Sequence, residues 1–555
     1  MNSRFLPRRQ PFHLTIPETS LWYNLEVSAT RFASRPALTF GGATINYREF
    51  HAQCLAVAGF LQKECGVRRG DRVALFMHNS PQFVIAYYGI LRADAVVVPI
   101  NCMNTTGELD QVLRDAGATT IITAQELQPR VEPLLGDAVR HSIVACYADY
   151  AGDEAASVLP EALAAPRMPI SKRESTQARV TPWHEVLEQA HAPAPHAAGP
   201  DDLALICYTS GTTGKPKGCV HRHRGVMHST VAIAHWHDVR HHACSLVVLP
   251  LFHVTGMQNS MNTHIYAGSR MVLMPRWNRE AAFAAIARHQ VTTITTVPAM
   301  IVDLISNYDA ARHDLSSMRL IGGGGAAMPE AVAARLQELC GLTYLEGYGM
   351  TETLAPTHIN PGDRPKAQCL GIPIFDTDAR IIDPQTLAEL PQGAVGEVIV
   401  SGPQVLEEYW NKPEENAACF LVRDGRKFLR TGDLARVDED GYYHFVDRLK
   451  RMINAAGFKV WPAEIEALLY SHPGVQEACV IGKHDPRSGE LVKALVVPRE
   501  AARATLAAEE IIAWSLQRMA AYKVPREVEL VASLPKSATG KIDWRLLQEQ
   551  EAARS

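Results

Sequence analysis

A run rich in glycine, hydroxyl and lysine side chains follows an apolar segment near the middle of the chain, and it limits the possible folds more than any other feature. The apolar residues 203–208 predict a strand leaving a core, so residues 208–218 are expected to form a loop at its end. Glycines let backbone N–H groups crowd an anion, and hydroxyls and lysines add donors and charge. The best ligand is a polyphosphate. The predicted contacts are Thr209, Ser210, Gly211, Thr212, Thr213, Gly214 and Lys215.

This loop differs from the Walker A phosphate-binding loop (P-loop) of nucleoside triphosphatases. Lys215 is followed by Pro216, where the P-loop has a Ser or Thr that binds magnesium, and the glycine spacing also differs. The alternative is a flexible, solvated turn, which the density of glycines, hydroxyls and lysines disfavours.

The length of 555 residues exceeds what one hydrophobic core usually supports, so at least two domains are expected. A formal net charge of −4 indicates no general attraction to nucleic acid. The basic start lacks the apolar core of a secretory signal, and Arg92 and Asp94 interrupt the longest apolar stretch, which argues against a membrane span. A soluble protein is expected.

The cysteines and histidines suggest neither disulfides nor a metal cluster. Eleven cysteines are scattered without a C-x-x-C pair, which favours reduced thiols and a cytoplasmic location. Histidines crowd residues 221–242, but Asp238 is the only acid near them. Solvated or core histidines are favoured there.

Strand and helix patterns alternate along the chain and predict two doubly wound α/β units. Residues 151–200, rich in Ala, Pro and charge, predict a surface connection, and residues 362–400 predict short antiparallel strands or a barrel-like piece. The predicted strands include 73–77, 119–123, 246–253, 292–298 and 318–321, and the predicted helices include 81–91 and 225–236.

Four further motifs carry candidate chemistry. Residues 322–325 are four consecutive glycines at the end of a predicted strand. Either the backbone there must approach a ligand closely, or the glycines form a turn that enters the next helix. In the run 346–352, Tyr348 offers a stacking face, Thr351 a hydroxyl for phosphate, and Glu352 a carboxylate suited to Mg²⁺. Asp433 can accept from both ribose hydroxyls. Lys541, on a glycine turn near the C-terminus, is a charge that a moving domain can deliver.

Together these motifs resemble the signature of the adenylate-forming superfamily, in the acyl-CoA synthetase branch, from about Trp22 to Lys541. The resemblance implies that a carboxylic acid attacks the α-phosphate of ATP to give an acyl adenylate, from which CoA then displaces AMP. The implied cofactors are ATP, Mg²⁺ and coenzyme A. It also implies a large AMP-binding domain over residues 1–449, followed by a small, mobile α+β lid over residues 450–555.

The resemblance assigns roles to single residues. Lys541, Thr351, Glu352 and His253 are the implied catalytic groups, with Glu352 also holding the metal. Lys450 falls at the implied hinge, and Ala455-Ala456 before Gly457 departs from many relatives, which leaves the CoA contacts open. The remaining implied nucleotide and CoA contacts are Gly323, Gly324, Glu346, Gly347, Tyr348, Gly349, Asp433, Arg448, Gly457 and Lys459.

The acid itself is expected to have an uncharged tail. Amino-acid-activating relatives carry an Asp where this chain has His253, and a buried ammonium without an anion is costly. A medium- or long-chain fatty acid is the first choice, and an aryl or arylalkanoic acid is the alternative. The predicted pocket residues are His253, Thr255, Gly256, Met257, Val297 and Pro298.

Two other classes of protein remain open. A luciferase-like oxygenase would share the adenylation step, and an inactive AMP-binding sensor would lack a catalytic group, whereas Thr351, Glu352, Asp433 and Lys541 are all present. Neither a nucleic acid nor an integral membrane partner is expected, and a homodimer is left open.

Overall fold

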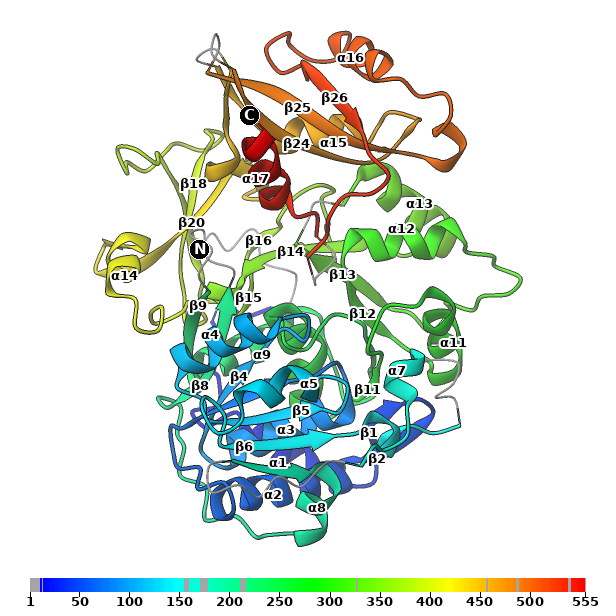
Figure 1. Ribbon diagram of the computed structural model, residues 1–555. Helices are drawn as coiled ribbons and strands as arrows, with labels where there is room; N and C mark the ends of the chain where they lie inside the picture. Colours follow the sequence, from blue (N-terminus) through cyan, green and yellow to red (C-terminus); the bar gives the residue numbers. More distant parts are fainter. Residues whose placement is uncertain are drawn as a thin grey trace.

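The computed structural model describes residues 10–11, 13–153, 159–169, 178–209, 216–325, 328–455, 458–485, 489–537 and 541–554. Two large sheets form most of the N-terminal part, a smaller antiparallel sheet follows, and a mixed α/β unit at the C-terminus lies beyond it (Figure 1). None of the helices in these ranges is long and apolar enough to cross a bilayer. The predicted α/β fold, with a large N-terminal part and a small C-terminal one, is confirmed.

The first large sheet has seven strands in the described residues, in the order β7-β6-β5-β3-β4-β8-β9. It is parallel except for the last pair. The strands are β3 (Arg72–Phe76), β4 (Val96–Pro99), β5 (Thr120–Ala124), β6 (His141–Ala145), β7 (Arg179–Pro182), β8 (Leu203–Thr209) and β9 (Lys217–Arg222).

The strands of this sheet are apolar on both faces because both faces are covered. Val73 and Leu75 of β3 point into one core cluster, while Ala74 and Phe76 point into another. The Ser80 side chain caps the next helix by accepting from Phe83 N. The helices of this region are α1 (Trp22–Arg31), α2 (Tyr47–Lys63), α3 (Pro81–Arg92), α4 (Thr106–Ala116), α5 (Gln128–Val131), α7 (Glu161–Ala164), α8 (Trp183–Gln189) and α9 (His223–Trp236).

The second large sheet has nine strands in the described residues, in the order β16-β15-β14-β13-β12-β10-β11-β1-β2, and its central strands are parallel. The strands are β1 (Pro36–Phe40), β2 (Ala43–Asn46), β10 (Cys244–Val247), β11 (Arg270–Leu273), β12 (Thr293–Thr296), β13 (Leu320–Gly324), β14 (Tyr344–Met350), β15 (Ala355–Ile359) and β16 (Ile372–Pro373). The helices are α10 (Thr263–Ala267), α11 (Arg279–His289), α12 (Pro298–Ser306) and α13 (Glu330–Cys340).

The remaining sheets are small. One contains β17 (Asp378–Ile382), β18 (Gly396–Ser401), β19 (Phe420–Arg423), β20 (Arg426–Val437) and β21 (Tyr443–Arg448), with α14 (Pro413–Cys419) beside it. The C-terminal one contains β22 (Ile453–Ala455), β23 (Phe458–Val460), β24 (Val475–Asp485), β25 (Gly489–Pro498) and β26 (Glu527–Leu530). Its helices are α15 (Pro462–Leu469), α16 (Ala508–Leu516) and α17 (Trp544–Arg554).

Two sequence-based expectations about elements were wrong. Residues 151–200 are more than a surface connection, because β7 completes an edge of the first sheet and Trp183 of α8 is buried in the main core. The strand predicted at 246–253 ends at Val247, and a π-helix follows over Gly256–Asn262. Apolar residues continue past the strand because the following segment is also buried.

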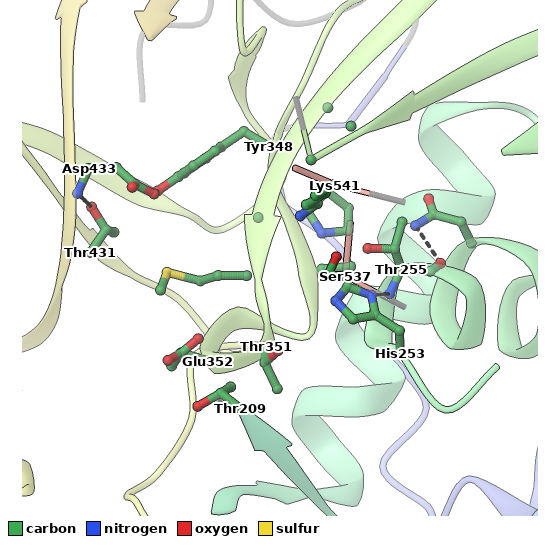
Figure 2. Close-up of a pocket in the computed structure, with 18 of the residues that line it drawn as sticks. Thr209, His253, Thr255, Tyr348, Thr351, Glu352, Thr431, Asp433, Ser537 and Lys541 are labelled. Atoms are coloured by element: carbon green, nitrogen blue, oxygen red, sulfur yellow. Dashed lines mark hydrogen bonds between the residues drawn. The ribbon is translucent and has the colours of Figure 1, made fainter. Parts of the chain in front are cut away.

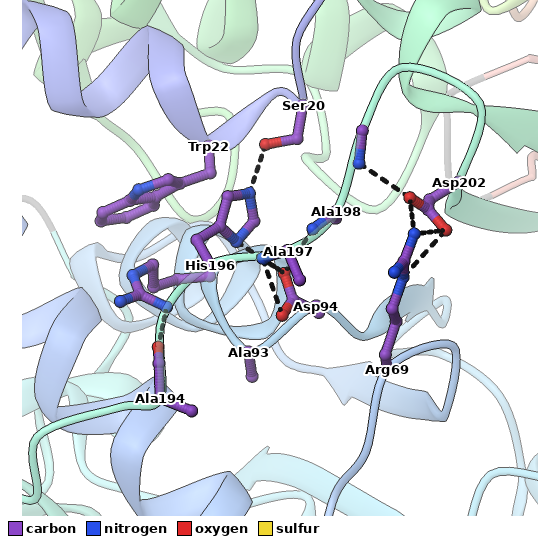
Figure 3. A network of polar contacts seen from close by, with 12 residues as sticks. Ser20, Trp22, Arg69, Ala93, Asp94, Ala194, His196, Ala197, Ala198 and Asp202 are labelled. Atoms are coloured by element: carbon purple, nitrogen blue, oxygen red, sulfur yellow. Dashed lines mark hydrogen bonds and ion pairs between the residues drawn. The ribbon is translucent and has the colours of Figure 1, made fainter.

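Polar contacts hold the chain between α8 and β8 against the first sheet (Figure 3). Ser20 Oγ lies 2.5 Å from His196 Nε2, and His196 Nδ1 lies 2.6 Å from Asp94 Oδ1. Asp94 also accepts from the backbone N–H groups of Ala197 and Ala198. The order resembles a Ser-His-Asp triad, but Ser20 is fully buried and no substrate can reach it, so its role is structural.

Asp94 lies at φ +61°, so replacing it with glycine relieves the backbone strain but removes the acceptor of the Ala197 and Ala198 N–H groups and the partner of His196. We expect Asp94→Gly to destabilise the protein by about 1–3 kcal/mol, measured as a lower urea midpoint by tryptophan fluorescence. Asp424→Gly is the matched control, because Asp424 also has a positive φ and its ion pair with Arg380 is mostly exposed. An equal shift in both variants would contradict the role given to Asp94.

Candidate active site

A cavity of about 850 Å³ lies where the second large sheet meets the segment that precedes α17. Residues of β12, β13 and β14 form one wall, and residues of β20 and β21 contribute another. The C-terminal unit adds Ser537 and Lys541, which point toward the side of the cavity formed by His253 and Thr255 (Figure 2). Four parts of the chain that are far apart in sequence therefore converge here.

The first three glycines of the run, 322–324, belong to β13, where they allow close packing of neighbouring strands and also line the cavity. A Cβ on Gly323 would lie 1.8 Å from the Thr296 carbonyl oxygen, and one on Gly324 would lie 2.2 Å from that of Gly347. Both glycines also line the cavity. Neither close approach to a ligand nor a helix-entry turn, the two explanations that the sequence offered, is needed for these glycines, because the neighbouring strands already exclude side chains.

Gly325 makes room for the lysine of the C-terminal segment. It has φ +87°, and a Cβ on it would lie 2.3 Å from Lys541 Cε. Burial lowers the pKa of Lys541 to about 8, and the nearby positive charge of Arg448 acts in the same direction. The negative charge around the Lys541 ammonium is therefore too small to balance its positive charge. Such a site suits an anionic ligand.

The side chain of Asp433 is the centre of a small polar group. It accepts from the Tyr348 hydroxyl at 2.7 Å and pairs with Arg448 Nε at 3.1 Å. The pairing of β20 with β21 places Asp433 directly opposite Arg448. Because Tyr348 donates to this carboxylate, its ring orientation is fixed beside Gly347 and Gly349, which also line the cavity. An aromatic face next to a carboxylate suits a nucleoside.

Glu352 is a buried carboxylate beside the cavity. Burial raises its pKa, and the Tyr409 hydroxyl, which donates to Glu352 Oε1 at 2.9 Å, partly offsets this effect. Thr351 and Thr209 line the same part of the cavity (Figure 2), and the Thr351 carbonyl lies 2.9 Å from His221 Nε2. Glu352 forms no ion pair among the described residues, and a hard carboxylate oxygen of this kind fits Mg²⁺, which takes one or two protein carboxylates along with phosphate and water. Within the described ranges, no group of three His, Cys, Asp or Glu side chains could hold a metal.

His253 and Thr255 line the cavity, as predicted for the acid-binding end. The Thr255 backbone N–H donates to His253 Nδ1 at 3.3 Å, so the proton of the neutral imidazole belongs on Nε2. Burial lowers the pKa of His253 to about 3, with the charge of Lys541 adding to the effect. The ring is therefore a neutral hydrogen-bond donor at physiological pH.

Four of the predicted pocket residues do not line the cavity. Met257 is fully buried in the main core, Gly256 packs against the Pro250 carbonyl, and Val297 and Pro298 lie at the start of α12. The π-helix explains the difference for Met257, because residues four apart lie on one face and residue 257 turns away from it. Asn259, whose Nδ2 donates to the Thr255 carbonyl at 3.1 Å, takes the predicted place in the wall.

Glu346 also does not line the cavity. Its carboxylate accepts from the backbone N–H groups of Gln368 at 2.9 Å and Met328 at 3.4 Å, and burial raises its pKa to about 7. It joins segments around β14, so the structure gives it a positioning role and not a nucleotide contact.

Some of the predicted contacts lie outside the described residues. These are Ser210, Gly211, Thr212, Thr213, Gly214, Lys215 and Gly457, and the side chain of Lys459 is likewise not described. Lys450 lies in the turn Leu449–Arg451 and lines the cavity, where burial lowers its pKa.

Sequence reasoning missed several lining residues, among them Tyr409, Asn259, His237 and Trp544. Tyr409 follows a Glu-Glu pair in a segment without a glycine-rich signal, so only its contact with Glu352 reveals it. Asn259 could have been found from its spacing of four from Thr255, had a helix been expected there.

Comparison with known proteins agrees with this geometry. The model of the AMP-binding enzyme family matches residues 25–410, and that of the AMP-binding enzyme C-terminal domain matches residues 464–541. The chain belongs to the AMP-binding enzyme family. This confirms the predicted membership of the adenylate-forming superfamily in its acyl-CoA synthetase branch.

Two proteins similar to this chain are named as enzymes that join an acid to CoA. The long-chain-fatty-acid–CoA ligase of Bacillus subtilis (strain 168) is 35% identical over 558 residues, covering 98% of this chain and 97% of the relative. A feruloyl-CoA synthase from an Amycolatopsis species is 34% identical, covering 91% of this chain and 94% of the relative. The predicted enzyme class, an AMP-forming acid–CoA ligase, is thereby borne out.

Solved structures show the same fold. ATP-bound MatB from Rhodopseudomonas palustris superposes with a TM-score of 0.83 at 27% identity, covering 97% of this chain and all of MatB. The anthranilate CoA ligase AuaEII in complex with anthranoyl-AMP also has a TM-score of 0.83, at 26% identity, covering 98% of this chain and 99% of AuaEII.

The depressed pKa of Lys541 predicts how adenylate formation depends on pH. The ammonium is present below about pH 8 and is lost as the pH rises through that value. We therefore expect kcat/KM for ATP in acid-dependent ATP–pyrophosphate exchange, without CoA, to fall about tenfold per pH unit above it. In Lys541→Arg the guanidinium stays charged, so the residual activity should lose this alkaline limb. The same limb in both enzymes would contradict the assignment.

Proposed function

We propose that the protein activates a medium- or long-chain fatty acid as its acyl adenylate and then transfers the acyl group to CoA, releasing AMP and pyrophosphate. The observation that carries this proposal is the position of the Lys541 ammonium. Lys541 belongs to the C-terminal unit, and its side chain enters the cavity that Glu352, Asp433 and His253 also line. A cation, a metal-type carboxylate and a ribose-type carboxylate in one site suit the first half-reaction.

In that half-reaction, a carboxylate oxygen of the acid forms a bond to the α-phosphorus while the bond to pyrophosphate breaks. Lys541 stabilises the negative charge that gathers between the two anions, and the Nε2–H of His253 orients the acid. Thr351 and the loop after Thr209 hold the phosphates. Mg²⁺, which would be held by Glu352 with Tyr409 fixing that carboxylate, supplies charge neutralisation at the phosphates when bound.

Asp433 is proposed to bind the ribose, with Arg448 as a second contact and Tyr348 as the face for adenine. The pairing of Tyr348 and Arg448 with Asp433 supports this assignment, because it holds the carboxylate in place before nucleotide arrives. Gly323, Gly324, Gly347 and Gly349 would let the backbone approach the ligand.

In the second half-reaction, the CoA thiolate attacks the adenylate carbonyl and AMP leaves. We place the boundary between the AMP-binding domain and the lid at residues 449 and 450, with Lys450 as the hinge. The position of Lys450 in a short turn between two sheets supports this boundary. Gly457 and Lys459 are proposed to face the CoA arm when the lid rotates.

A fatty acid is proposed because two similar proteins, at 35% and 34% identity, are named long-chain-fatty-acid–CoA ligases. The second candidate is an aryl acid. Three polar side chains of the cavity wall favour an aryl acid, because a plain methylene chain would leave them without hydrogen-bond partners. They are Thr255, Asn259 and His237. A cytoplasmic location is also proposed, because all eleven cysteines are free thiols.

The experiment that tests the acid is a panel from acetate through palmitate, with ferulate, benzoate and phenylalanine, measured by acid-dependent pyrophosphate release and CoA-ester formation. Each buried methylene contributes about 0.8 kcal/mol, so kcat/KM should rise about fourfold per carbon until the cavity is full. Acetate should be poor for lack of burial, and phenylalanine because its ammonium finds no anion. A maximum at ferulate would select the second candidate, and one at acetate or phenylalanine would refute both.

The ribose assignment has its own test in AMP binding. We expect Asp433→Ala to weaken AMP binding in calorimetry by about 10–100-fold, since it removes two acceptors and leaves Arg448 unpaired. Asp438→Ala is the control, because this carboxylate pairs with Lys366 outside the cavity. Equal AMP affinity in wild type and Asp433→Ala would rule out the ribose role.

A further inference from the structure

The segment that carries Lys541 is held at both ends by the C-terminal unit. It follows β26 and leads into α17, and in Figure 1 it descends from these elements toward β13 and β14. In its described residues, Ser537 N donates to the Lys541 carbonyl at 2.7 Å and Asp543 N donates to that of Pro535 at 2.8 Å. These bonds close a narrow hairpin, so the place of Lys541 in the cavity depends on where β26 and α17 are fixed.

One buried lysine contacts both of these elements. The ammonium of Lys493, on β25, lies 2.9 Å from Glu527 and 2.8 Å from Glu529, which are two residues apart on one face of β26. It also lies 2.9 Å from Glu551 of α17. The side chains of Lys493 and Glu551 are almost fully buried. The strand before the hairpin and the helix after it are thus joined at a single ammonium.

The surrounding charges balance this contact. Lys483 of β24 pairs with Glu527 at 2.6 Å and with Glu551 at 3.5 Å, and Arg554 lies 3.6 Å from Glu529. The cluster therefore contains three cations and three carboxylates. The Lys493 ammonium has three N–H donors, and each can donate to one of the three carboxylates. These bonds fix the direction of each contact in addition to balancing the charge.

We propose that Lys493 is a positioning residue for adenylate formation, which sets the reach of the Lys541 hairpin by clamping β26 to α17. This inference rests on the proposed role of Lys541. Apolar packing alone gives less directional control, because the contacts of Leu534 and Leu547 with β24 and β25 allow sliding that three ionic hydrogen bonds to one atom do not. Neither Lys493 nor its three carboxylate partners line the cavity, so we expect the clamp to act through the position of Lys541.

The test separates the two half-reactions in Lys493→Met, a side chain of similar length without charge. We expect kcat of acid-dependent ATP–pyrophosphate exchange to fall at least tenfold with KM for ATP within twofold, and thioester formation from synthetic acyl adenylate and CoA to stay within twofold. Lys493→Arg should recover part of the exchange. Lys523→Met is the control, because Lys523 pairs with Glu464 in the same unit away from the hairpin.

A double variant shows whether Lys493 acts through Lys541. In the Lys541→Ala background, adding Lys493→Met should lower the residual exchange no further. Equal losses in both half-reactions, or additive losses in the double variant, would overturn the proposal. If Lys493→Met does not fold, Glu551→Gln releases α17 while leaving Lys493 paired with β26, and the same outcomes apply. Absence of exchange in the wild type with every acid would refute the proposed function, whereas normal exchange in Lys493→Met and Glu551→Gln would refute only the clamp.

Discussion

The structure depends on the packing of the Lys541 stem against Gly325, because this contact joins the C-terminal unit to the sheet that forms the cavity. A side chain at residue 325 would occupy the space of the lysine, and its positive φ also favours glycine. Burial without a matching anion makes the ammonium costly in the free protein. That cost is relieved by an anionic ligand, so the site favours a phosphate-bearing ligand before any reaction begins.

Three carboxylate side chains in the active-site region have different roles because their surroundings differ. Asp433 is paired with Arg448 and accepts from Tyr348, so its carboxylate is held in one position. Glu352 accepts from the Tyr409 hydroxyl and forms no ion pair in the part of the chain that the structure describes, which suits a metal ligand. Glu346 is satisfied by two backbone N–H groups and is turned away from the cavity. Residue type alone would place all three at the ligand.

The cavity wall that is proposed to bind the acid is shaped by the π-helix Gly256–Asn262, which stands where the sequence predicted a loop after the strand 246–253. Thr255, directly before this helix, and Asn259 within it line the cavity, whereas Met257 enters the core. This arrangement makes the wall more polar than the sequence suggested. It is the reason that an aryl acid with hydrogen-bonding groups stays beside a fatty acid as a candidate.

The strand–helix alternation, the two-part fold, the family and the glycine and acidic motifs could all be predicted from the sequence, because they depend on local pattern and on spacing within short runs. Which side chains share the cavity depends on the folded arrangement. It excluded Met257 and Glu346, added Tyr409 and Asn259, and joined Lys493 to the hairpin of Lys541. Contacts between residues tens or hundreds of positions apart leave no local pattern, and the direction of a side chain depends on a backbone period that apolar composition does not fix.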